Sequence, residues 1–235
     1  MLISHDGLSG KDLERLRQFD TCTLSNAIER LNIRPRNQGF ISGTASCRFP
    51  KLPPVIGYAV TGKIRASMPP VGGRWYYERI DFWEYLSTIP APRIIVLQDV
   101  DQLPGVGALF GEIHAHICRA LSSVAYVTNG AVRDVPGIEA MGFQLFSGGV
   151  SVSHAYAHIV EFGNPIEIGG LRISPGDLLH GDLHGVHSIP AVDPDKLVSL
   201  AEHVLAQDHE MFELTKRKEF SVEMLAAKLK KQVGR

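Results

Sequence analysis

The sequence predicts an α/β fold with helical segments at both ends, and three observations support this prediction. Short apolar, β-favouring runs such as VIGYAVT at 55–61 and RIIVLQD at 93–99 are separated by segments whose apolar residues recur at helical spacing. The chain starts and ends with further helix-patterned segments, at 11–33 and from about Asp193 onward. No internal repeat, low-complexity tract or linker-like change of composition divides it, so we expect one domain over residues 1–235.

Composition excludes several classes of partner. Hydrophobic residues make up 44% and charged residues 21% of the 235 residues, as is ordinary for a globular protein. Because the formal net charge is −1, we expect neither nucleic acid nor a membrane surface as a partner. Cys22, Cys47 and Cys118 form no CxxC pair, which favours reduced thiols. The N-terminal segment lacks the apolar core of a signal peptide and no run approaches a membrane span, so we expect a cytoplasmic protein.

The N-terminal third predicts two helices and then strands. Residues 11–33 contain two helical patterns, and Thr21 or Thr23 is a candidate N-cap of the second. Strand candidates follow at Gly39–Ile41 and, more strongly, at Val55–Thr61. Lys63 and Arg65 come next, and two cations at a strand end are more often surface charges than anion ligands.

The middle of the chain combines aromatic, apolar and glycine-rich segments. Residues 74–87 are aromatic and helix-like, which favours core or subunit-contact packing over stacking on nucleic-acid bases. Residues 93–99 read as a buried strand. Gly105, Gly107 and Gly111 predict a flexible approach to the next helix, and their spacing matches neither a Walker A nor a GxGxxG nucleotide motif.

Residues 111–134 form the segment around which the rest is organised: a helix, an apolar strand at 125–128 and a tight turn ending in Arg133–Asp134. The helix is predicted to place its apolar and polar residues on opposite faces. Its predicted apolar face holds Ile113, Ile117, Ala120 and Leu121, and its polar face holds Glu112, His116 and Arg119. Asn129–Gly130 predicts a turn because both residues tolerate positive φ.

The sequence after Asp134 predicts first a short helix closed by Gly142 and then a strand with a glycine break. Several short strands are predicted over 166–190, followed by helix to the end. The cations of this last helical region are predicted to form a solvated face. His154 and His158 are spaced i, i+4, but without the glutamate of HExxH they are a weak metal signal, and a loop or subunit contact is favoured.

Polar groups of the 111–134 segment predict a candidate site. Arg133 offers a planar fork for a carboxylate, and Asp134 is a hard oxygen ligand for Mg²⁺. Glu112 and the backbone N–H groups of Ile113 and His114 lie at a helix start, where an anion is stabilised. The alternative is structural: Asp134 caps the following helix and Arg133 pairs with a surface acid. Spacing alone slightly favours this alternative.

The segment GEIHAHICRALSSVAYVTNGAVRDVPGIEAMGFQLFSGGVS, followed by GGLRISPGDLLHGDLHGVHSIP, resembles the RraA-like family. That family includes class II pyruvate aldolases that cleave 4-hydroxy-4-methyl-2-oxoglutarate and 4-carboxy-4-hydroxy-2-oxoadipate. The resemblance is clearest over about residues 105–190. It implies a swivelling-domain-like α/β sandwich, assembled as a homotrimer or homohexamer with active sites between subunits.

The resemblance also implies roles for individual residues. Arg133 would bind the substrate and Asp134 the metal, while Glu112 would hold the water used in proton transfer. The backbone N–H groups of Ile113 and His114 would hold the pyruvyl carboxylate. An acid from a neighbouring subunit's C-terminal helix would complete the site. Glu210 is the first match for that acid, with Glu213 next.

The chain departs from the family pattern at two places. Position 137 is glycine where aldolases of the family often have Asp or Glu, so Glu139 or a loop histidine such as His114 is the candidate replacement. The basic, Gly-rich loop that tends to follow the GVS strand is replaced by VSHAYAHIVEFG. Both departures concern the substrate more than the metal.

The expected activity is that of a carbon–carbon lyase. With Mg²⁺ or Mn²⁺ it would cleave a 4-hydroxy-2-oxo acid to pyruvate through a metal-stabilised enolate, and it would also decarboxylate oxaloacetate. The main alternative is a non-catalytic RraA-like regulator that binds a protein, as some family members inhibit a ribonuclease. A third candidate is another metal-dependent enolate reaction on a related 2-oxo acid, suggested by His114, His154 and His158.

Overall fold

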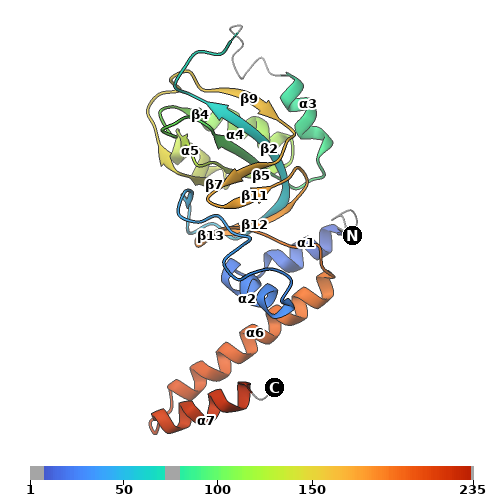
Figure 1. Ribbon diagram of the computed structural model, residues 1–235, viewed down its shortest axis with the longest axis vertical. Helices are drawn as coiled ribbons and strands as arrows, with labels where there is room; N and C mark the ends of the chain where they lie inside the picture. The colour runs from blue at the N-terminus through green and yellow to red at the C-terminus, as the bar shows by residue number, and fades with distance from the viewer. Residues whose placement is uncertain (1–7, 72–79, 234–235) are drawn as a thin grey trace.

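The computed structural model describes residues 8–71 and 80–233, and Figure 1 shows their arrangement. The helices of this part are α1 (Gly10–Arg17), α2 (Thr21–Leu31), α3 (Ile80–Thr88), α4 (Glu112–Ala120), α5 (Val135–Ala140), α6 (Pro194–Thr215) and α7 (Val222–Val233). The strands are β1 (Ser46–Cys47), β2 (Val55–Arg65), β3 (Arg93–Asp99), β4 (Ala108–Phe110), β5 (Ser123–Val127), β6 (Ala131–Val132), β7 (Gln144–Ser147), β8 (Gly149–Val150), β9 (His158–Phe162), β10 (Ile166–Ile168), β11 (Leu171–Ile173), β12 (Leu178–Asp182) and β13 (Gly185–Ser188). The α/β class and the helical ends are therefore as predicted.

The main sheet has the order β1-β7-β5-β3-β2-β12-β13, with β9 paired to the far part of β2. Strands β2, β3, β5 and β7 run parallel, and the remaining pairings are antiparallel. A separate sheet of three short parallel strands has the order β4-β6-β8. The hairpin β10–β11 forms a third, two-stranded sheet.

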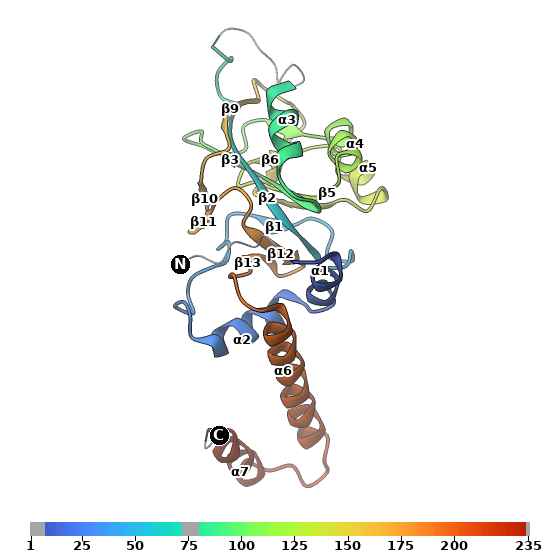
Figure 2. The same cartoon turned by 90° about the vertical axis from the view of Figure 1, so that its right-hand side faces the viewer.

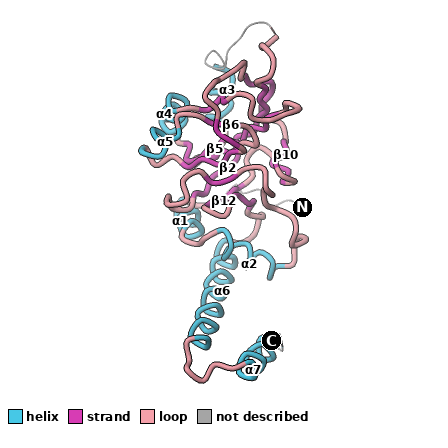
Figure 3. Tube along the Cα trace, turned by 90° about the vertical axis from the view of Figure 1, so that its left-hand side faces the viewer, coloured by secondary structure: helices cyan, strands magenta, loops and turns pink. Residues whose placement is uncertain are grey.

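The two faces of the main sheet bury different side chains because successive residues of a strand point to opposite faces. On β3, Ile95 and Leu97 pack with α3, α4 and α5, whereas Ile94 and Val96 pack with the β10–β11 hairpin. Figure 3 shows α4 and α5 on one side of the strands and β10 on the other. The sheet is thus a middle layer, which agrees with the predicted sandwich.

Helices from both ends of the chain share a third apolar cluster. Side chains of α1, α2 and α6 pack there against the β2 and β12 ends, with Leu16, Leu24 and Leu197 among the most buried. Beyond this cluster α6 leads away from the sheets, and α7 lies beside its far end (Figures 1 and 2). None of the described helices is long and apolar enough to cross a membrane.

One predicted detail at the start of the fold is revised. Asp20, not Thr21 or Thr23, is the N-cap of α2, and its carboxylate accepts from the Thr23 N–H at 2.6 Å. Thr21 instead donates its backbone N–H and its hydroxyl to the buried carboxylate of Asp182, at 2.8 and 2.7 Å. The cations Lys63 and Arg65, predicted as surface charges, are partly exposed at the end of β2 and pair with Glu161 and Asp101.

The aromatic segment is only partly described, since 72–79 lie outside the described residues. Its remaining part forms α3, where Phe82 is fully buried and packs edge-on against Trp83 and Phe162. The core-packing interpretation is therefore confirmed for this part of the segment.

Candidate functional site

Three short parallel strands bring the candidate residues together. β4 leads into α4, β6 leads into Arg133–Asp134 and then α5, and β8 leads into the loop that carries His154. The register aligns Ala131 of β6 with Ala108 of β4 and with Gly149 of β8. Because parallel strands end at one edge of a sheet, the segments that follow them converge there. Residues 105–111 were predicted to form a flexible approach to the next helix. This prediction is wrong because the segment contains β4.

Asp134 adopts an unusual backbone conformation. Its φ of 54° and ψ of 33° place it in the left-handed region, which is uncommon for a residue other than glycine. It occupies the N-cap position of α5, but its side chain makes no capping hydrogen bond there. Instead Oδ2 accepts from the Glu112 N–H at 3.3 Å, and Oδ1 accepts from Arg133 Nε at 3.2 Å. The structural alternative, a carboxylate that caps α5, is therefore wrong.

Two glycines leave room for the site's carboxylates. A Cβ at Gly111 would lie 2.5 Å from Asp134 Oδ2, so a side chain there would displace this carboxylate from the start of α4. A Cβ at Gly137 would lie 2.4 Å from Glu112 Oε2, so the Glu112 carboxylate lies directly over that glycine. The Glu112 carboxylate therefore occupies the space that a side chain at position 137 would take.

The amino end of α4 has no capping side chain of its own, because its N-cap is Gly111. Its first N–H groups have no acceptor within the helix, and the macrodipole adds partial positive charge there. The Asp134 carboxylate, which accepts the Glu112 N–H, lies at this end. The N–H groups of Ile113 and His114 are the ones left at this end to bind a further anion.

The side chains of α4 are arranged differently from the prediction. Ile113 is 65% exposed, and the buried face holds His114, Ala115 and Cys118. The His114 ring stacks on Phe110 at 5.0 Å between centroids, and burial lowers its pKa to about 4. His114 is therefore a neutral core residue within the helix, and its assignment as a loop histidine that replaces a metal ligand is wrong.

The tight turn before β6 also differs from the prediction. Neither Asn129 nor Gly130 has positive φ. The Asn129 side chain instead bridges to β3, where its Oδ1 accepts from the Asp99 N–H and its Nδ2 donates to the Asp99 carbonyl, at 2.7 and 2.9 Å. This bridge fixes the chain just before Arg133.

Arg133 is held by two partners. Its Nη1 lies 2.9 Å from His154 Nδ1, and its Nε donates to Asp134. Because a guanidinium only donates, the imidazole accepts at Nδ1 and is neutral. Burial and the Arg133 charge both lower the pKa of His154, although Asp134 opposes them. Sequence reasoning placed His154 in a loop but had no means to link it to Arg133.

The two histidines predicted as a weak metal pair have different environments. His158 lies in β9, is largely buried, and its Nδ1 is 2.7 Å from the Tyr156 carbonyl. His154 lies in the loop after β8 beside Arg133. In the described residues no three His, Cys, Asp or Glu side chains gather as a metal-binding group.

The oxygen donors nevertheless fit a Mg²⁺ ion. Mg²⁺ keeps several waters and takes only one or two protein carboxylates. The carboxylate of Asp134 is 39% exposed and that of Glu112 49%, so both are accessible to a hydrated ion. Asp134, whose two oxygens accept from the Glu112 N–H and from Arg133, is the candidate ligand, and Glu112 is the second accessible carboxylate.

The two predicted acids from the C-terminal helix lie elsewhere in the protomer. Glu210 pairs with Lys228 of α7, and Glu213 pairs with Lys216 at 2.7 Å. Both lie on the far part of α6, which leads away from α4 and α5 in Figures 1 and 2. Within one chain, the structure therefore does not bring either acid to Arg133.

Comparison with known proteins gives a consistent result. A family model described as RraA-like, Aldolase/RraA, matches residues 21–187. A Halalkalibacterium halodurans protein provisionally named a 4-hydroxy-4-methyl-2-oxoglutarate aldolase is 32% identical over 104 residues, which cover 43% of this chain and 49% of that protein. The chain thus matches only about half the length of this curated relative.

Solved structures share the fold. An uncharacterized protein from Pseudomonas syringae pv. tomato superposes with a TM-score of 0.74 at 20% identity, covering 97% of this chain and 98% of that one. Streptomyces coelicolor RraAS2, described as an unusual member of the RNase ES inhibitor RraA protein family, gives 0.64 at 21% identity, covering 90% and 98%. At these identities the likeness establishes the fold alone.

Proposed function

The chain belongs to the RraA-like (Aldolase/RraA) family, and from this premise we propose that it is a divalent-metal-dependent carbon–carbon lyase. Its substrate would be a 4-hydroxy-2-oxo acid, cleaved to pyruvate, with oxaloacetate decarboxylation as a side activity. The aldolase name of the 32%-identical relative supports this class of substrate. The observation that carries the proposal is the Asp134 carboxylate, which turns away from its own helix and lies beside Arg133 and the start of α4.

The residues have distinct roles in this proposal. Arg133 binds a substrate carboxylate through its planar fork, and His154 holds the guanidinium in place. The α4 amino end holds the pyruvyl carboxylate through the N–H groups of Ile113 and His114. Asp134 is the ligand of Mg²⁺ or Mn²⁺, which when bound supplies Lewis acidity to the keto and carboxylate oxygens.

Glu112 has the role of holding the water that transfers the proton to the reacting carbon. Retro-aldol cleavage breaks the C3–C4 bond as the C4 hydroxyl gives its proton to a water held by the Glu112 carboxylate. C4 becomes a carbonyl carbon, and the electron pair of the broken bond passes to C3 as the pyruvate enolate. A water held by the Glu112 carboxylate then delivers a proton to C3 and yields pyruvate. Loss of CO₂ from oxaloacetate leaves the same enolate, so the same proton delivery completes that reaction.

Pyruvate release tests the proposal directly. We expect oxaloacetate and 4-hydroxy-4-methyl-2-oxoglutarate to yield pyruvate with Mg²⁺ or Mn²⁺, and no turnover after exhaustive chelation. Asp134→Asn should lose about 100-fold or more in kcat/KM, because the proposed ligand is removed. Glu167→Gln, which changes an exposed carboxylate on the β10–β11 hairpin, is the matched control. Undiminished turnover after chelation would refute the proposal.

The second candidate is a non-catalytic regulator that binds another protein. Glycine at position 137 and the exposed apolar side chains of Ile113, Val150 and Val152 near the site favour it. The same assay separates the two candidates. Pyruvate formation that Asp134→Asn abolishes supports the lyase, and no pyruvate from any 2-oxo acid with either metal supports the regulator.

A further inference from the structure

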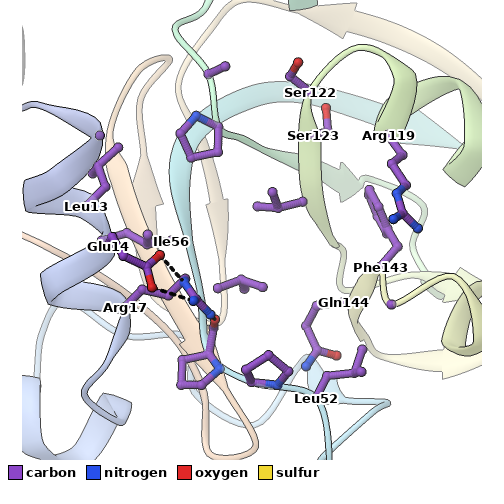
Figure 4. A pocket seen from close by; sticks show the side chains of 18 residues that line it. Leu13, Glu14, Arg17, Leu52, Ile56, Arg119, Ser122, Ser123, Phe143 and Gln144 are labelled. Atoms are coloured by element: carbon purple, nitrogen blue, oxygen red, sulfur yellow. Dashed lines mark hydrogen bonds and ion pairs between the residues drawn. The ribbon is translucent and has the colours of Figure 1, made fainter.

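Arg133 contacts its neighbouring carboxylate differently from another arginine of this chain. Arg17 pairs with Glu14 through two bonds, in which Nε and Nη2 donate to the two carboxylate oxygens at 2.8 and 2.7 Å (Figure 4). This two-bond geometry is the one in which a guanidinium and a carboxylate match best. In the described part of the chain, Arg133 instead makes one contact with Asp134, from Nε to Oδ1 at 3.2 Å. The pair of Arg133 and Asp134 is therefore only half formed.

His154 binds the other end of the Arg133 guanidinium. Nη1 of Arg133 lies 2.9 Å from Nδ1 of the ring and 3.5 Å from Nε2, so the nearer Nδ1 is the acceptor. A ring nitrogen accepts only while it carries no proton. Burial and then the Arg133 charge lower the pKa of His154, against the opposing effect of Asp134. The guanidinium is thus held at both ends, by a carboxylate at Nε and by a neutral ring at Nη1.

The backbone of His154 is fixed by main-chain contacts that do not involve the guanidinium. The Ser153 carbonyl accepts from the Ala108 N–H at the start of β4, and the His154 carbonyl accepts from the Ala157 N–H, both at 2.9 Å. A Cβ at Gly107 would lie 2.3 Å from the His154 carbonyl oxygen, so a side chain there would displace this loop. The imidazole is therefore presented to the guanidinium from a loop that is anchored on β4.

A second bond between Arg133 and Asp134 would reduce what both side chains can do. At present Oδ2 of Asp134 accepts from the Glu112 N–H at 3.3 Å, and only Oδ1 contacts the guanidinium. Pairing Oδ2 with Nη2, as in Arg17 and Glu14, would neutralise the Asp134 charge more completely and weaken its attraction for a cation. It would also occupy Nη2, which a substrate carboxylate needs for a two-bond contact.

We propose that His154 is a positioning residue, which keeps the Arg133 guanidinium from closing onto Asp134. It leaves the Asp134 carboxylate to the metal ion and the outer edge of the guanidinium to the substrate. His154 acts through Arg133 and not on the reacting atoms, a role that rests on the proposed function. The loop that contains His154 stands where the family's basic, Gly-rich loop is expected, so the device belongs to this chain's own sequence.

Calorimetric titration of the full chain with Mg²⁺ tests this role. His154→Leu removes the acceptor and keeps an apolar side chain, so we expect Mg²⁺ affinity to fall by about 10–100-fold, as for other outer partners of a metal ligand. His154→Asn presents an amide oxygen as far along the side chain as Nδ1, so it should bind Mg²⁺ nearly as well as the wild type. His203→Leu, at an exposed position of α6, is the matched control and should not change the affinity.

A double variant separates positioning from loss of structure. If the guanidinium closes onto Asp134 in His154→Leu, removing the guanidinium as well should free the carboxylate again. We therefore expect the double variant Arg133→Gln, His154→Leu to bind Mg²⁺ as tightly as Arg133→Gln alone. A merely structural role of His154 predicts instead that the double variant binds as weakly as His154→Leu.

Three results would refute the role of His154 and leave the lyase proposal standing. They are equal Mg²⁺ affinity in the wild type and His154→Leu, equal weakening in His154→Asn and His154→Leu, and a double variant that binds as weakly as His154→Leu. A wild type that binds neither Mg²⁺ nor Mn²⁺ and releases no pyruvate would refute the lyase proposal, and the role of His154 with it.

Discussion

Arg133 is the residue on which the proposed chemistry depends most, and its surroundings determine what a substitution does. Its side chain is 28% exposed, and its guanidinium contacts Asp134 and His154. We expect Arg133→Lys to lower kcat/KM for oxaloacetate by about 10–100-fold, because an ammonium cannot reproduce a bidentate contact to carboxylate. Steady-state kinetics measure this, with Arg172→Lys as the matched control. Near-normal kinetics in Arg133→Lys would show that the arginine is structural.

Gly137 is the other position at which a single side chain should change the site. It does not have positive φ, so its backbone accepts a side chain, but a Cβ would meet the Glu112 carboxylate. We expect Gly137→Ala to displace Glu112 and to lower kcat about tenfold without loss of folding. Gly137→Asp should tighten Mg²⁺ binding, because it adds a second carboxylate to the Asp134 side of the site.

Metal titration checks the effect of Gly137, with Glu139→Gln as the control. Glu139 is exposed on α5, and its side chain is not needed if Glu112 covers position 137. Equal Mg²⁺ affinity in the wild type, Gly137→Asp and Glu139→Gln would mean that neither position contributes to the metal's surroundings.

At the scale of elements, the sequence predicts existence and type better than orientation. The helix at 112–120 was predicted, but its buried face was not, because periodicity counts histidine as polar while aromatic packing buries His114. The strand β4 is too short to show a pattern, and only its pairing with β6 defines it. Non-local pairing of this kind leaves no local signal.

Some features of the site could also not be predicted from the sequence. Arg133, Asp134 and Glu112 were found from residue type, spacing and resemblance. The left-handed backbone of Asp134 was not, because nothing in the residues beside it requires that conformation. The contact between Arg133 and His154 depends on β8 lying parallel to β6, which only the fold establishes.

The β12–β13 pair contains two buried histidines whose lowered pKa values predict a pH-dependent stability. His180 and His187 are directly paired across the strands, with ring centroids 5.5 Å apart. Burial lowers the pKa of His180 to about 4 and that of His187 well below its ordinary value, where the His180 and Arg34 charges add to the effect. Asp182 opposes this at both rings.

Stability should therefore fall as the pH falls through the window between about 6.5 and 4. In that window the unfolded chain binds protons that the folded protein does not bind, so the loss is absent above pH 6.5. We expect the free energy of unfolding to decrease between pH 7 and pH 5 by about 1–2 kcal/mol for each buried histidine. Denaturant titrations of His187→Leu should show a smaller decrease than the wild type. His203→Leu, at an exposed position of α6, is the control, and a slope unchanged in His187→Leu would contradict the prediction.

At the scale of the whole molecule, the far part of α6 and α7 form an arm that extends away from the sheets (Figures 1 and 2). Apolar side chains are exposed along it, including Leu205, Phe212 and Val222, at 45%, 58% and 75%. Exposed apolar side chains gathered on one part of a protein commonly mark a protein interface. The arm also carries Glu210 and Glu213, which lie far from the site of their own chain (Figure 1). Both observations favour a homotrimer or homohexamer in which the arm reaches a neighbouring site.

Co-expression of two inactive variants tests whether sites are shared between subunits. Arg133→Lys and Glu210→Gln should each have little activity alone. If Arg133 of one subunit works with Glu210 of a neighbour, random assortment restores complete sites with a probability of about one quarter, so about a quarter of wild-type activity should return. Light scattering should show a trimer or hexamer.

Lys228→Gln breaks the same ion pair as Glu210→Gln but keeps the carboxylate, so it should stay active if the pair itself is only structural. A fully active monomer at micromolar concentration, or no recovery in the mixed oligomer when both parents are inactive, would show that each site is complete within one chain. Full activity of Glu210→Gln with loss in Glu213→Gln would move the role to Glu213, one turn further along α6.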